Sequence, residues 1–273
     1  MVFRTRFAPS PTGFLHLGHA FSALTAFDAA QAAGGEFILR IEDIDHTRCR
    51  PAFEAAIHQD LAAIGLSWPQ PVLRQSQHLC DYQAALERLR DLGVVYADAR
   101  TRKGQAEAAL GAPQEGDASA SGSEAAPPAW RLSLDAARKV LGARYDDLGF
   151  VDDVRGEQRA TPQVNGDVVL GRRDIGVAYH LCVVVDDARQ GINHVIRGRD
   201  LFDATHTQVL LQALLCLPQP RYHHHALLLD AEGRRLAKRK GSKALRDYLD
   251  EGLLDEGRGE AHIRALIARS PKQ

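Results

Sequence analysis

Segments with the two-residue period of a strand alternate with segments of helical period over the first part of the chain. The expected strands are residues 5–8, 36–41 and 94–96, and the expected helices are residues 20–33, 53–64 and 79–92. A helix between two strands carries the chain back across a sheet, so that the strands run parallel. We therefore predict a layered α/β domain that opens with a βαβ unit.

The middle of the chain changes in composition. Residues 103–128 are mainly Ala, Gly, Ser, Glu and Pro, with too little apolar surface to offset the entropy of ordering, so a flexible surface loop is expected there. Ordered patterns resume at Trp130. Expected later are strands at 194–197 and 227–229, and helices at 202–215, 244–249 and 260–267. These elements suit the second half of one α/β domain.

Composition excludes several classes of protein. A chain of 273 residues that is 45% hydrophobic and 25% charged can bury a core for one large or two small domains. A net charge of -1 argues against coating nucleic acid through bulk charge, so that any such contact must be local. No secretory signal or apolar run of ~18 residues is present, and the four cysteines form no CxxC pair. We expect a cytoplasmic monomer with no membrane partner.

The segment from Arg6 to His19 combines a strand, a break and a helix start. The prolines and glycine of Pro9–Gly13 end regular structure, and the helix that follows places His16, Gly18 and His19 at its N-terminus. Unpaired N–H groups and the positive end of the helix dipole attract anions there, and imidazoles can donate to phosphate oxygens. The pattern favours ATP, and the alternative is a helix cap with no further role.

Two further segments carry clustered charge. Strand 36–41 delivers Glu42, Asp43 and Asp45 to its carboxyl end, the edge at which open α/β sheets bind ligands. The alternative is that these carboxylates solvate a turn and cap the next helix. Residues 233–241 form a basic loop, and a basic run read alone is commonly a solvated face.

These segments resemble, in order, the motifs of the glutamyl branch of the class I aminoacyl-tRNA synthetases. Residues 6–13 read RFAPSPTG, and His16–His19 is similar to the HIGH signature with one conservative change. Residues 39–45 are similar to the LRIEDTD stretch of that branch.

The resemblance continues in the second half. Residues 179–187 and 191–200 are similar to the YHLAxVVDD and HVIRGxD segments. Residues 235–239 resemble the KMSKS loop, in which Lys238 is retained while an arginine replaces the first lysine and Ala237 replaces the serine. The resemblance covers about residues 4–100 and 168–243.

The resemblance implies a Rossmann-like, doubly wound parallel sheet with an inserted α+β subdomain of the acceptor-binding kind and a short helical tail. It implies a first half of the catalytic domain at 1–98, an insert at 99–167, a second half with the KMSKS-like loop at 168–243, and a tail at 244–273. Full-length glutamyl enzymes carry anticodon-binding helical domains after this loop, whereas the tail here is shorter than the ~50 residues of a domain. The better resemblance is to the truncated family, the glutamyl-Q tRNA(Asp) synthetases.

By this resemblance, the chain is an ATP-dependent ligase that converts L-glutamate and Mg²⁺-ATP into glutamyl-adenylate without tRNA. The glutamyl group would then pass to the queuosine base at the wobble position of tRNA(Asp). Two alternatives stay open. One is a truncated synthetase that charges the 3′ end of tRNA(Glu), and the other is a non-catalytic paralogue, binding tRNA or the amino acid, whose KMSKS loop has decayed at Ala237.

The resemblance also assigns the site residues. Catalytic roles fall to His16, His19 and Lys238. Glutamate binding is expected from Arg6, Phe7, Ala8, Pro9, Ser10, Glu42, Tyr179 and Arg197. ATP binding is expected from His16, Gly18, His19, Arg235, Leu236, Ala237, Lys238 and Arg239. A cationic loop with Mg²⁺ suits a transition state that spreads charge over the α-phosphate and the leaving pyrophosphate.

Arg6 and Arg197 are the most informative of these residues chemically. A guanidinium can hold a substrate carboxylate in a bidentate fork, at about 1.5–3 kcal/mol per charged hydrogen bond. Tyr179 can add a hydroxyl donor, and Glu42 suits the substrate ammonium. Glutamine would turn its own donors toward these donors and lack the charge, so such a site can reject it by about 10⁴. The alternative for both arginines is a surface ion pair.

Two features bear on metals. Members of the truncated family often carry a zinc site of the form CxC…YxxxC, but Asp98 and Arg100 stand here where the paired cysteines would be, so no structural zinc is expected. The run His223–His225 comes just before the strand expected at 227–229. Because neighbouring strand residues face opposite ways, packing and solvent contacts are favoured there over a metal site.

Overall fold

The computed structural model describes residues 2–98, 128–172, 176–230, 233, 243–250 and 258–273. Most of the loop expected at 103–128 lies outside the described residues. The same holds for Arg100 and for the KMSKS-like residues 235–239.

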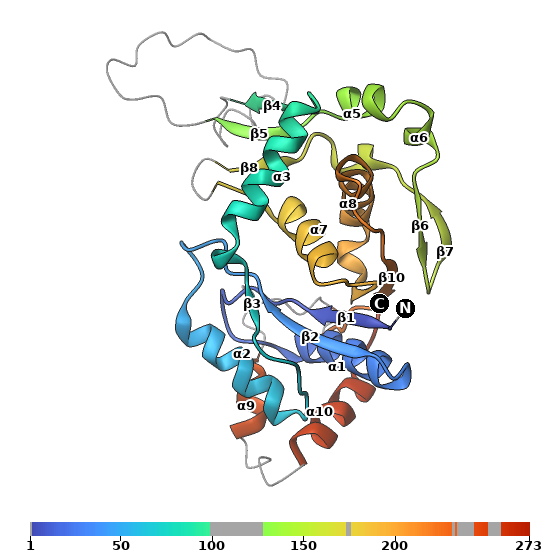
Figure 1. The fold of residues 1–273 in the computed structure, drawn as a ribbon. Coiled ribbons are helices and arrows are strands. Elements are labelled where there is room, and N and C mark those ends of the chain that lie inside the picture. The colour runs from blue at the N-terminus through green and yellow to red at the C-terminus, as the bar shows by residue number, and fades with distance from the viewer. Residues whose placement is uncertain (1, 99–127, 173–175, 231–232, 234–242, 251–257) are drawn as a thin grey trace.

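A parallel sheet forms the centre of the molecule (Figure 1). Its first half has the order β1-β2-β3, with all pairs parallel, from β1 (Arg4–Phe7), β2 (Glu36–Ile41) and β3 (Leu73–Arg74). Its second half has the order β7-β6-β10-β9, from β6 (Gly149–Asp152), β7 (Gly156–Arg159), β9 (His194–Gly198) and β10 (Arg221–His225). Only the edge strand β7 is antiparallel to its neighbour there.

The two halves meet where β1 lies beside the start of β9. The Arg4 N–H donates to Asn193 Oδ1 at 2.8 Å, and the Asn193 N–H donates to the Arg4 carbonyl at 3.1 Å. The strands therefore follow the order β3-β2-β1-β9-β10-β6-β7 across both halves. This order confirms the predicted doubly wound sheet.

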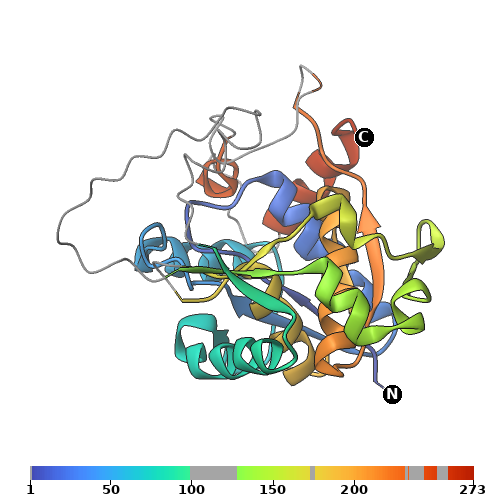
Figure 2. The same cartoon turned by 90° about the horizontal axis from the view of Figure 1, so that it is seen from above.

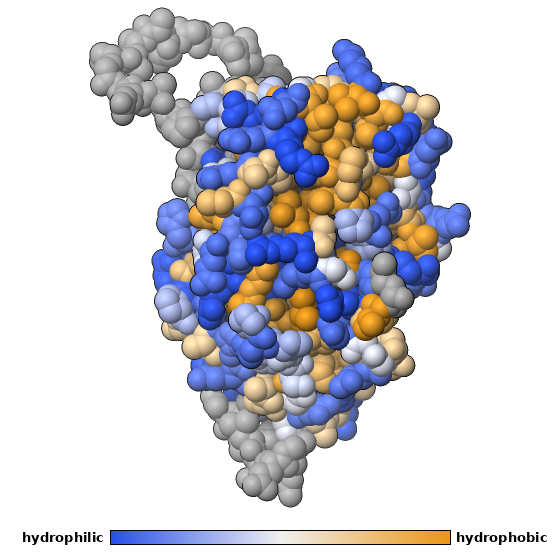
Figure 3. All heavy atoms as spheres, viewed as in Figure 1, coloured by the Kyte–Doolittle hydropathy of each residue, from blue (hydrophilic) through white to orange (hydrophobic). Residues whose placement is uncertain are grey.

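Helices cover both faces of this sheet (Figure 1). On one face lie α1 (Leu17–Ala32), α2 (Pro51–Ala63), α9 (Leu245–Asp250) and α10 (Arg258–Arg269). On the other face lie α3 (Leu79–Asp91), α7 (Tyr179–Arg189) and α8 (Phe202–Leu215). Figure 3 shows apolar side chains gathered in the upper half of one surface, near α8, within a largely hydrophilic exterior.

An antiparallel sheet, β4-β5-β8, adjoins the second layer. It consists of β4 (Val95–Asp98), β5 (Ala129–Leu132) and β8 (Val169–Gly171), followed along the chain from β5 by α5 (Leu134–Leu141) and α6 (Ala143–Asp146). Leu132 and Leu170 of this sheet pack in one core with Leu89 of α3. In Figure 2 the sheet lies beside α3, drawn in teal. Short 3₁₀ turns occupy Gln75–Gln77, Pro162–Asn165 and Arg199–Leu201.

The alternation of side chains in β1 and β2 positions the site. Phe37, Leu39 and Ile41 of β2 enter the core under α1, as Phe7 of β1 does. The residues between them must face the other way, because successive strand residues point to opposite faces. Arg6 of β1 and Arg40 of β2 accordingly project toward α7 and are buried there.

The end of the chain differs from the sequence prediction in one respect. The strand expected at 227–229 is absent from the described residues, since the last register pair of β10 joins His225 to Gly198, and Leu228 makes only an isolated bridge with Lys272. The two final helices, expected as a short helical tail, pack against α1 and α2. Ile263 and Ile267 pack into it, and Arg264 makes two 2.7 Å bonds to Asp28 of α1. No helix in the described ranges is long and apolar enough to cross a membrane.

Candidate active site

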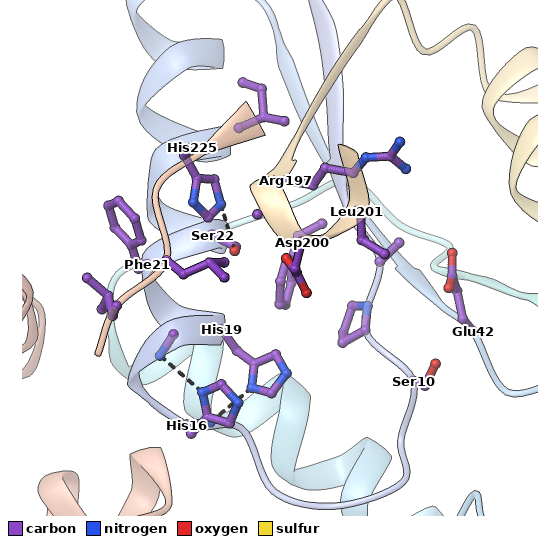
Figure 4. Close-up of a pocket in the computed structure, with 18 of the residues that line it drawn as sticks. Ser10, His16, His19, Phe21, Ser22, Glu42, Arg197, Asp200, Leu201 and His225 are labelled. Carbon is purple, nitrogen blue, oxygen red and sulfur yellow. Dashed lines mark hydrogen bonds between the residues drawn. The ribbon is translucent and has the colours of Figure 1, made fainter. Parts of the chain in front are cut away.

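A cavity of about 570 Å³ opens at the carboxyl ends of β1, β2, β9 and β10 (Figure 4). It lies where the connections after β1 and β9 leave for opposite faces of the sheet, the place at which ligands bind in open α/β folds. Every predicted site residue that the structure describes lines it. These are Arg6, Phe7, Ala8, Pro9, Ser10, His16, Gly18, His19, Glu42, Tyr179 and Arg197.

His16 and His19 begin α1 as a reciprocal cap. His16 Nδ1 accepts the Gly18 N–H at 3.1 Å, and His19 Nδ1 accepts the His16 N–H at 3.1 Å. An imidazole whose Nδ1 accepts must carry its hydrogen on Nε2 when it is neutral. The cap therefore turns both rings into Nε2–H donors at one end of the cavity, and the capping and ligand-binding roles are compatible.

Arg6 is held by a carboxylate of α7. Its Nε and Nη2 donate to the two oxygens of Asp187 at 3.0 and 3.3 Å, and the side chain is almost fully buried. Burial disfavours the ionised form of Asp187, but Arg6 and Arg40 outweigh that effect and lower the pKa of this carboxyl. Nη1 of Arg6 is the nitrogen that the fork leaves for the cavity.

Arg40 is a residue that sequence reasoning missed. It is fully buried and donates to Asp187 at 2.8 Å and to Glu42 at 3.3 Å, and its Nε lies 3.7 Å from Asp186. Burial alone would lower the pKa of Arg40, but the three carboxylates raise it, so it is always charged. Its sequence signal is an arginine within the apolar part of a strand, between Leu39 and Ile41.

Glu42 and Arg197 lie on the same side of the cavity (Figure 4). Tyr179 also lines the cavity, close enough to both residues for their charges to act on its hydroxyl. Burial raises the pKa of Glu42, against the opposing charges of Arg40 and Arg6. Burial also raises the pKa of Tyr179, so that its hydroxyl keeps its hydrogen at neutral pH. The Glu42 N–H donates to the Pro9 carbonyl at 3.1 Å, which ties the strand end to the loop after β1.

Arg197 differs from Arg6 in having neutral partners. Its Nε donates to His224 Nε2 at 3.2 Å and its Nη2 to Thr205 Oγ1 at 2.7 Å. Within the described ranges, no carboxylate lies within ion-pair distance of this guanidinium, and its buried Nη1 has no hydrogen-bond partner. The positive charge of Arg197 is therefore the less compensated of the two.

The histidine run lies inside β10 rather than before a strand. His224 is packed in the interior, as predicted, whereas His225 lines the cavity, which the sequence did not reveal. Burial lowers the pKa of His225, whose Nδ1 donates to the Ala226 carbonyl at 2.8 Å while its Nε2 accepts from Ser22 Oγ, also at 2.8 Å. Among the described residues, no group of His, Cys, Asp and Glu could hold a metal ion.

At the position of the first expected zinc cysteine, the structure has an ion pair. Arg131 Nε donates to Asp98 at 2.7 Å and Arg131 Nη1 to the Asp167 carbonyl at 2.7 Å. The Asp98 side chain is only 3% exposed. A carboxylate engaged in this way does not fit a thiolate zinc site.

Comparison with known proteins places this fold in a class. Residues 2–258 match the family described as tRNA synthetases class I (E and Q), catalytic domain, and the chain belongs to this family of ATP-dependent ligases. A glutamyl-Q tRNA(Asp) synthetase of Rhodobacter capsulatus is 46% identical over 96% of this chain and 99% of that protein. One of Nocardia farcinica is 42% identical over 90% of this chain and 79% of that protein. Within its class, the chain is thus a member of the glutamyl-Q tRNA(Asp) synthetase family.

Solved structures agree on the fold. A glutamate tRNA ligase of Elizabethkingia meningosepticum, in complex with its amino acid, superposes with a TM-score of 0.70 at 29% identity over 88% of this chain. A glutamate-tRNA synthetase of Elizabethkingia anophelis gives a TM-score of 0.70 at 28% identity. The chain spans 53% of each of these two proteins, about half their length.

Proposed function

We propose that this chain activates L-glutamate with Mg²⁺-ATP to glutamyl-adenylate in the absence of tRNA, and transfers the glutamyl group to the queuosine base at the wobble position of tRNA(Asp). The observation that carries the proposal is the presence, in one cavity, of the Arg197 guanidinium, which has no ion-pair partner among the described residues, and the buried Glu42 carboxylate. An amino acid with an acidic side chain complements both groups.

Glutamate is placed by charge. Glu42 accepts the α-ammonium group, whose arrival offsets the effect of burial and keeps this carboxylate ionised. Arg197, with the free Nη1 of Arg6, takes the side-chain carboxylate. Tyr179 stays protonated and can donate to the same carboxylate. Glutamine has no charge for Arg197 and directs an NH₂ group at donors, so it leaves buried groups unpaired.

ATP occupies the other end of the cavity. The Nε2–H groups of His16 and His19 and the start of α1 are aimed at phosphate oxygens. An α-carboxylate oxygen of glutamate attacks the α-phosphorus, and the bond to the leaving pyrophosphate breaks. Lys238 and the loop 235–239, with the Mg²⁺ of the nucleotide, would neutralise this charge, a role that rests on the sequence resemblance.

The second step transfers the activated group. A hydroxyl of the queuosine ring attacks the glutamyl carbonyl, a new ester bond forms, and AMP leaves with the electron pair of the broken anhydride. The chain supplies position and charge rather than a covalent intermediate. A cavity of about 570 Å³ is within the usual size range of small-molecule sites.

Exchange of labelled pyrophosphate into ATP tests the first step. We expect exchange with glutamate and no tRNA, with a loss of at least about 100-fold for Arg197→Ala, which removes two or more charged hydrogen bonds. The exposed Arg138→Ala serves as the matched control. Absence of exchange in folded wild-type protein would refute the proposal.

Transfer to tRNA tests the second step. Labelled glutamate should attach to tRNA(Asp) that contains queuosine and not to unmodified tRNA(Asp). Periodate cleaves the diol of the 3′-terminal ribose and so blocks charging at the 3′ end of tRNA(Glu). Charging of intact tRNA(Glu) that periodate abolishes would favour a truncated synthetase of the ordinary kind. Glutamate binding without exchange would favour a non-catalytic paralogue.

A further inference from the structure

We propose that Asp152 and His224 form a positioning pair that holds the Arg197 guanidinium in place through uncharged contacts, and so set the affinity for glutamate and its preference over glutamine. The inference rests on the proposed function, because it assigns a support to the arginine that recognises the acidic side chain. Neither residue lines the cavity, and Arg197 is the lining residue to which His224 is hydrogen-bonded.

Asp152 is the fixed end of the pair. It is the last residue of β6, and its Oδ1 accepts the N–H groups of Val154 and Arg155, both at 2.9 Å. Its Oδ2 lies 2.5 Å from His224 Nδ1. Burial disfavours the ionised carboxyl, but the bonds from His224 and the two backbone groups outweigh it and lower the pKa of Asp152. The ionised carboxylate therefore requires a hydrogen on His224 Nδ1.

His224 connects Asp152 to Arg197 through its two ring nitrogens. With Nδ1 donating to Asp152, a neutral imidazole has its lone pair on Nε2, which accepts the Arg197 Nε–H at 3.2 Å. Burial, with the nearby Arg197 charge, lowers the pKa of His224 to about 4, against the pull of Asp152. The ring therefore stays neutral at physiological pH and remains an acceptor.

Two bonds then fix one edge of the guanidinium. Nε is held by His224 and Nη2 by Thr205 Oγ1 at 2.7 Å, which leaves Nη1 without a partner. Asp152 and His224 side chains are both 0% exposed, and the Phe202 ring packs on His224 with centroids 5.1 Å apart, so the geometry cannot relax into water. A fixed, pre-oriented guanidinium binds a carboxylate without an ordering cost.

The neutrality of the contacts is the functional point. Arg6 is bound by a carboxylate, so much of its charge is cancelled at short range. Among the described residues, the hydrogen-bond partners of Arg197 are an imidazole and a hydroxyl, and its guanidinium lies 5.6 Å from the centroid of the Tyr222 ring. The carboxylate of Asp152 lies one ring further away. A carboxylate in direct contact would compete with the substrate, whereas this arrangement orients the arginine and leaves its charge for the ligand.

The test compares Asp152→Asn, His224→Ala and His224→Gln with a buried control that does not contact Arg197, Tyr145→Phe, which removes a hydroxyl that accepts from Gln163 Nε2 at 3.1 Å. Pyrophosphate exchange gives KM and kcat for glutamate, glutamine and ATP. We expect Asp152→Asn and His224→Ala to raise KM for glutamate about 10-fold to 100-fold, as one charged hydrogen bond predicts, and to change KM for ATP by less than about twofold. The preference for glutamate over glutamine should fall by a similar factor.

His224→Gln supplies a rescue, since its side-chain oxygen can again accept from Arg197 Nε. Its KM for glutamate and its preference over glutamine should lie between those of the wild type and those of His224→Ala. A purely structural role would not predict this partial rescue. Circular dichroism and thermal melting establish folding. The inference is overturned if folded Asp152→Asn keeps the wild-type KM for glutamate and the wild-type preference over glutamine. It is also overturned if KM rises equally for glutamate and for ATP, or if neither Asp152→Asn nor His224→Gln folds.

Glutamate binding followed by thermal shift separates this inference from the function itself. If wild-type protein shows no exchange, the proposed function fails, but binding still measures whether Asp152→Asn weakens glutamate binding relative to Tyr145→Phe. Weakened binding supports the positioning pair, and wild-type affinity in the variant overturns it. Absence of glutamate binding in the wild type overturns both.

Discussion

Asp187 is the residue whose removal should reveal most about the stability of the site. It accepts the fork of Arg6 at 3.0 and 3.3 Å and a third bond from Arg40 at 2.8 Å, with all three side chains less than about a tenth exposed. The variant Asp187→Asn keeps the shape and one acceptor oxygen but removes the charge that two buried guanidinium groups share.

Breaking a buried ion pair by removal of one partner costs about 3–5 kcal/mol, because the remaining charge is left in a poorly polarisable interior. Two arginines depend on Asp187, but the asparagine oxygen retains one bond. We therefore expect a loss at the lower part of that range, about 3 kcal/mol. A surface pair offers the contrast. Asp146 faces Arg138 with 46% and 57% of the side chains exposed, and its substitution should cost about 1 kcal/mol or less.

Urea unfolding at pH 7 measures both variants, with Asp146→Asn as the control. The slope with denaturant should stay the same and the midpoint should move, because the surface buried on folding is unchanged. The reasoning is refuted if Asp187→Asn loses no more than Asp146→Asn does. It is also refuted if the double variant Arg6→Met with Asp187→Asn is no more stable than Asp187→Asn alone, since removal of an unpaired charge should restore stability.

Further outcomes follow from the same contacts. Arg197→Lys should raise KM for glutamate at least about 10-fold in pyrophosphate exchange. The lysine ammonium cannot bond both His224 and Thr205 and still reach a ligand. An unchanged KM would contradict this. Burial, and to a smaller extent the charge of Arg197, lowers the pKa of both His180 and His224 to about 4. The unfolded chain therefore binds more protons than the folded chain between about pH 6.5 and pH 4. Stability should fall as pH decreases through that window. Each histidine contributes about 1.4 kcal/mol per pH unit, and equal urea midpoints at pH 6.5 and pH 5 would show that this depression is absent. Since Asp98 is paired with Arg131, excess chelator should leave the melting temperature unchanged, and a shift with chelator would contradict the expected lack of zinc. The variant Asp98→Ala should lower the free energy of unfolding by about 1–3 kcal/mol.

The order of strands and helices was largely readable from the residues. Helix 202–215 and strand 36–41 were predicted at their observed bounds, because strong helical or alternating patterns bounded by polar residues leave little choice. The strand expected at 227–229 was wrong, since an apolar run of three leucines imitates a strand, while the pairing partner β9 ends opposite His225. Polar His223–His225 form the strand instead, because neighbouring strands satisfy their backbone groups whatever the side chains are.

Local sequence also determined the start of α1 and the acidic exit of β2. A cap is a contact between neighbours in the chain, so His16 and His19 meet wherever the helix is placed. Arg6 and Arg197 were singled out by the resemblance and by the fit of a guanidinium to a carboxylate, and both line the cavity.

Tertiary structure alone decided which charges are compensated. Arg6 pairs with Asp187 across 181 positions of the chain, whereas the hydrogen-bond partners of Arg197 in the described part of the chain are the neutral His224 and Thr205. Both are arginines in buried strands, and their sequences do not distinguish them. The difference arises because an ion pair depends on which helix covers which face of the sheet and on the removal of water, and both are properties of the packed fold rather than of any segment.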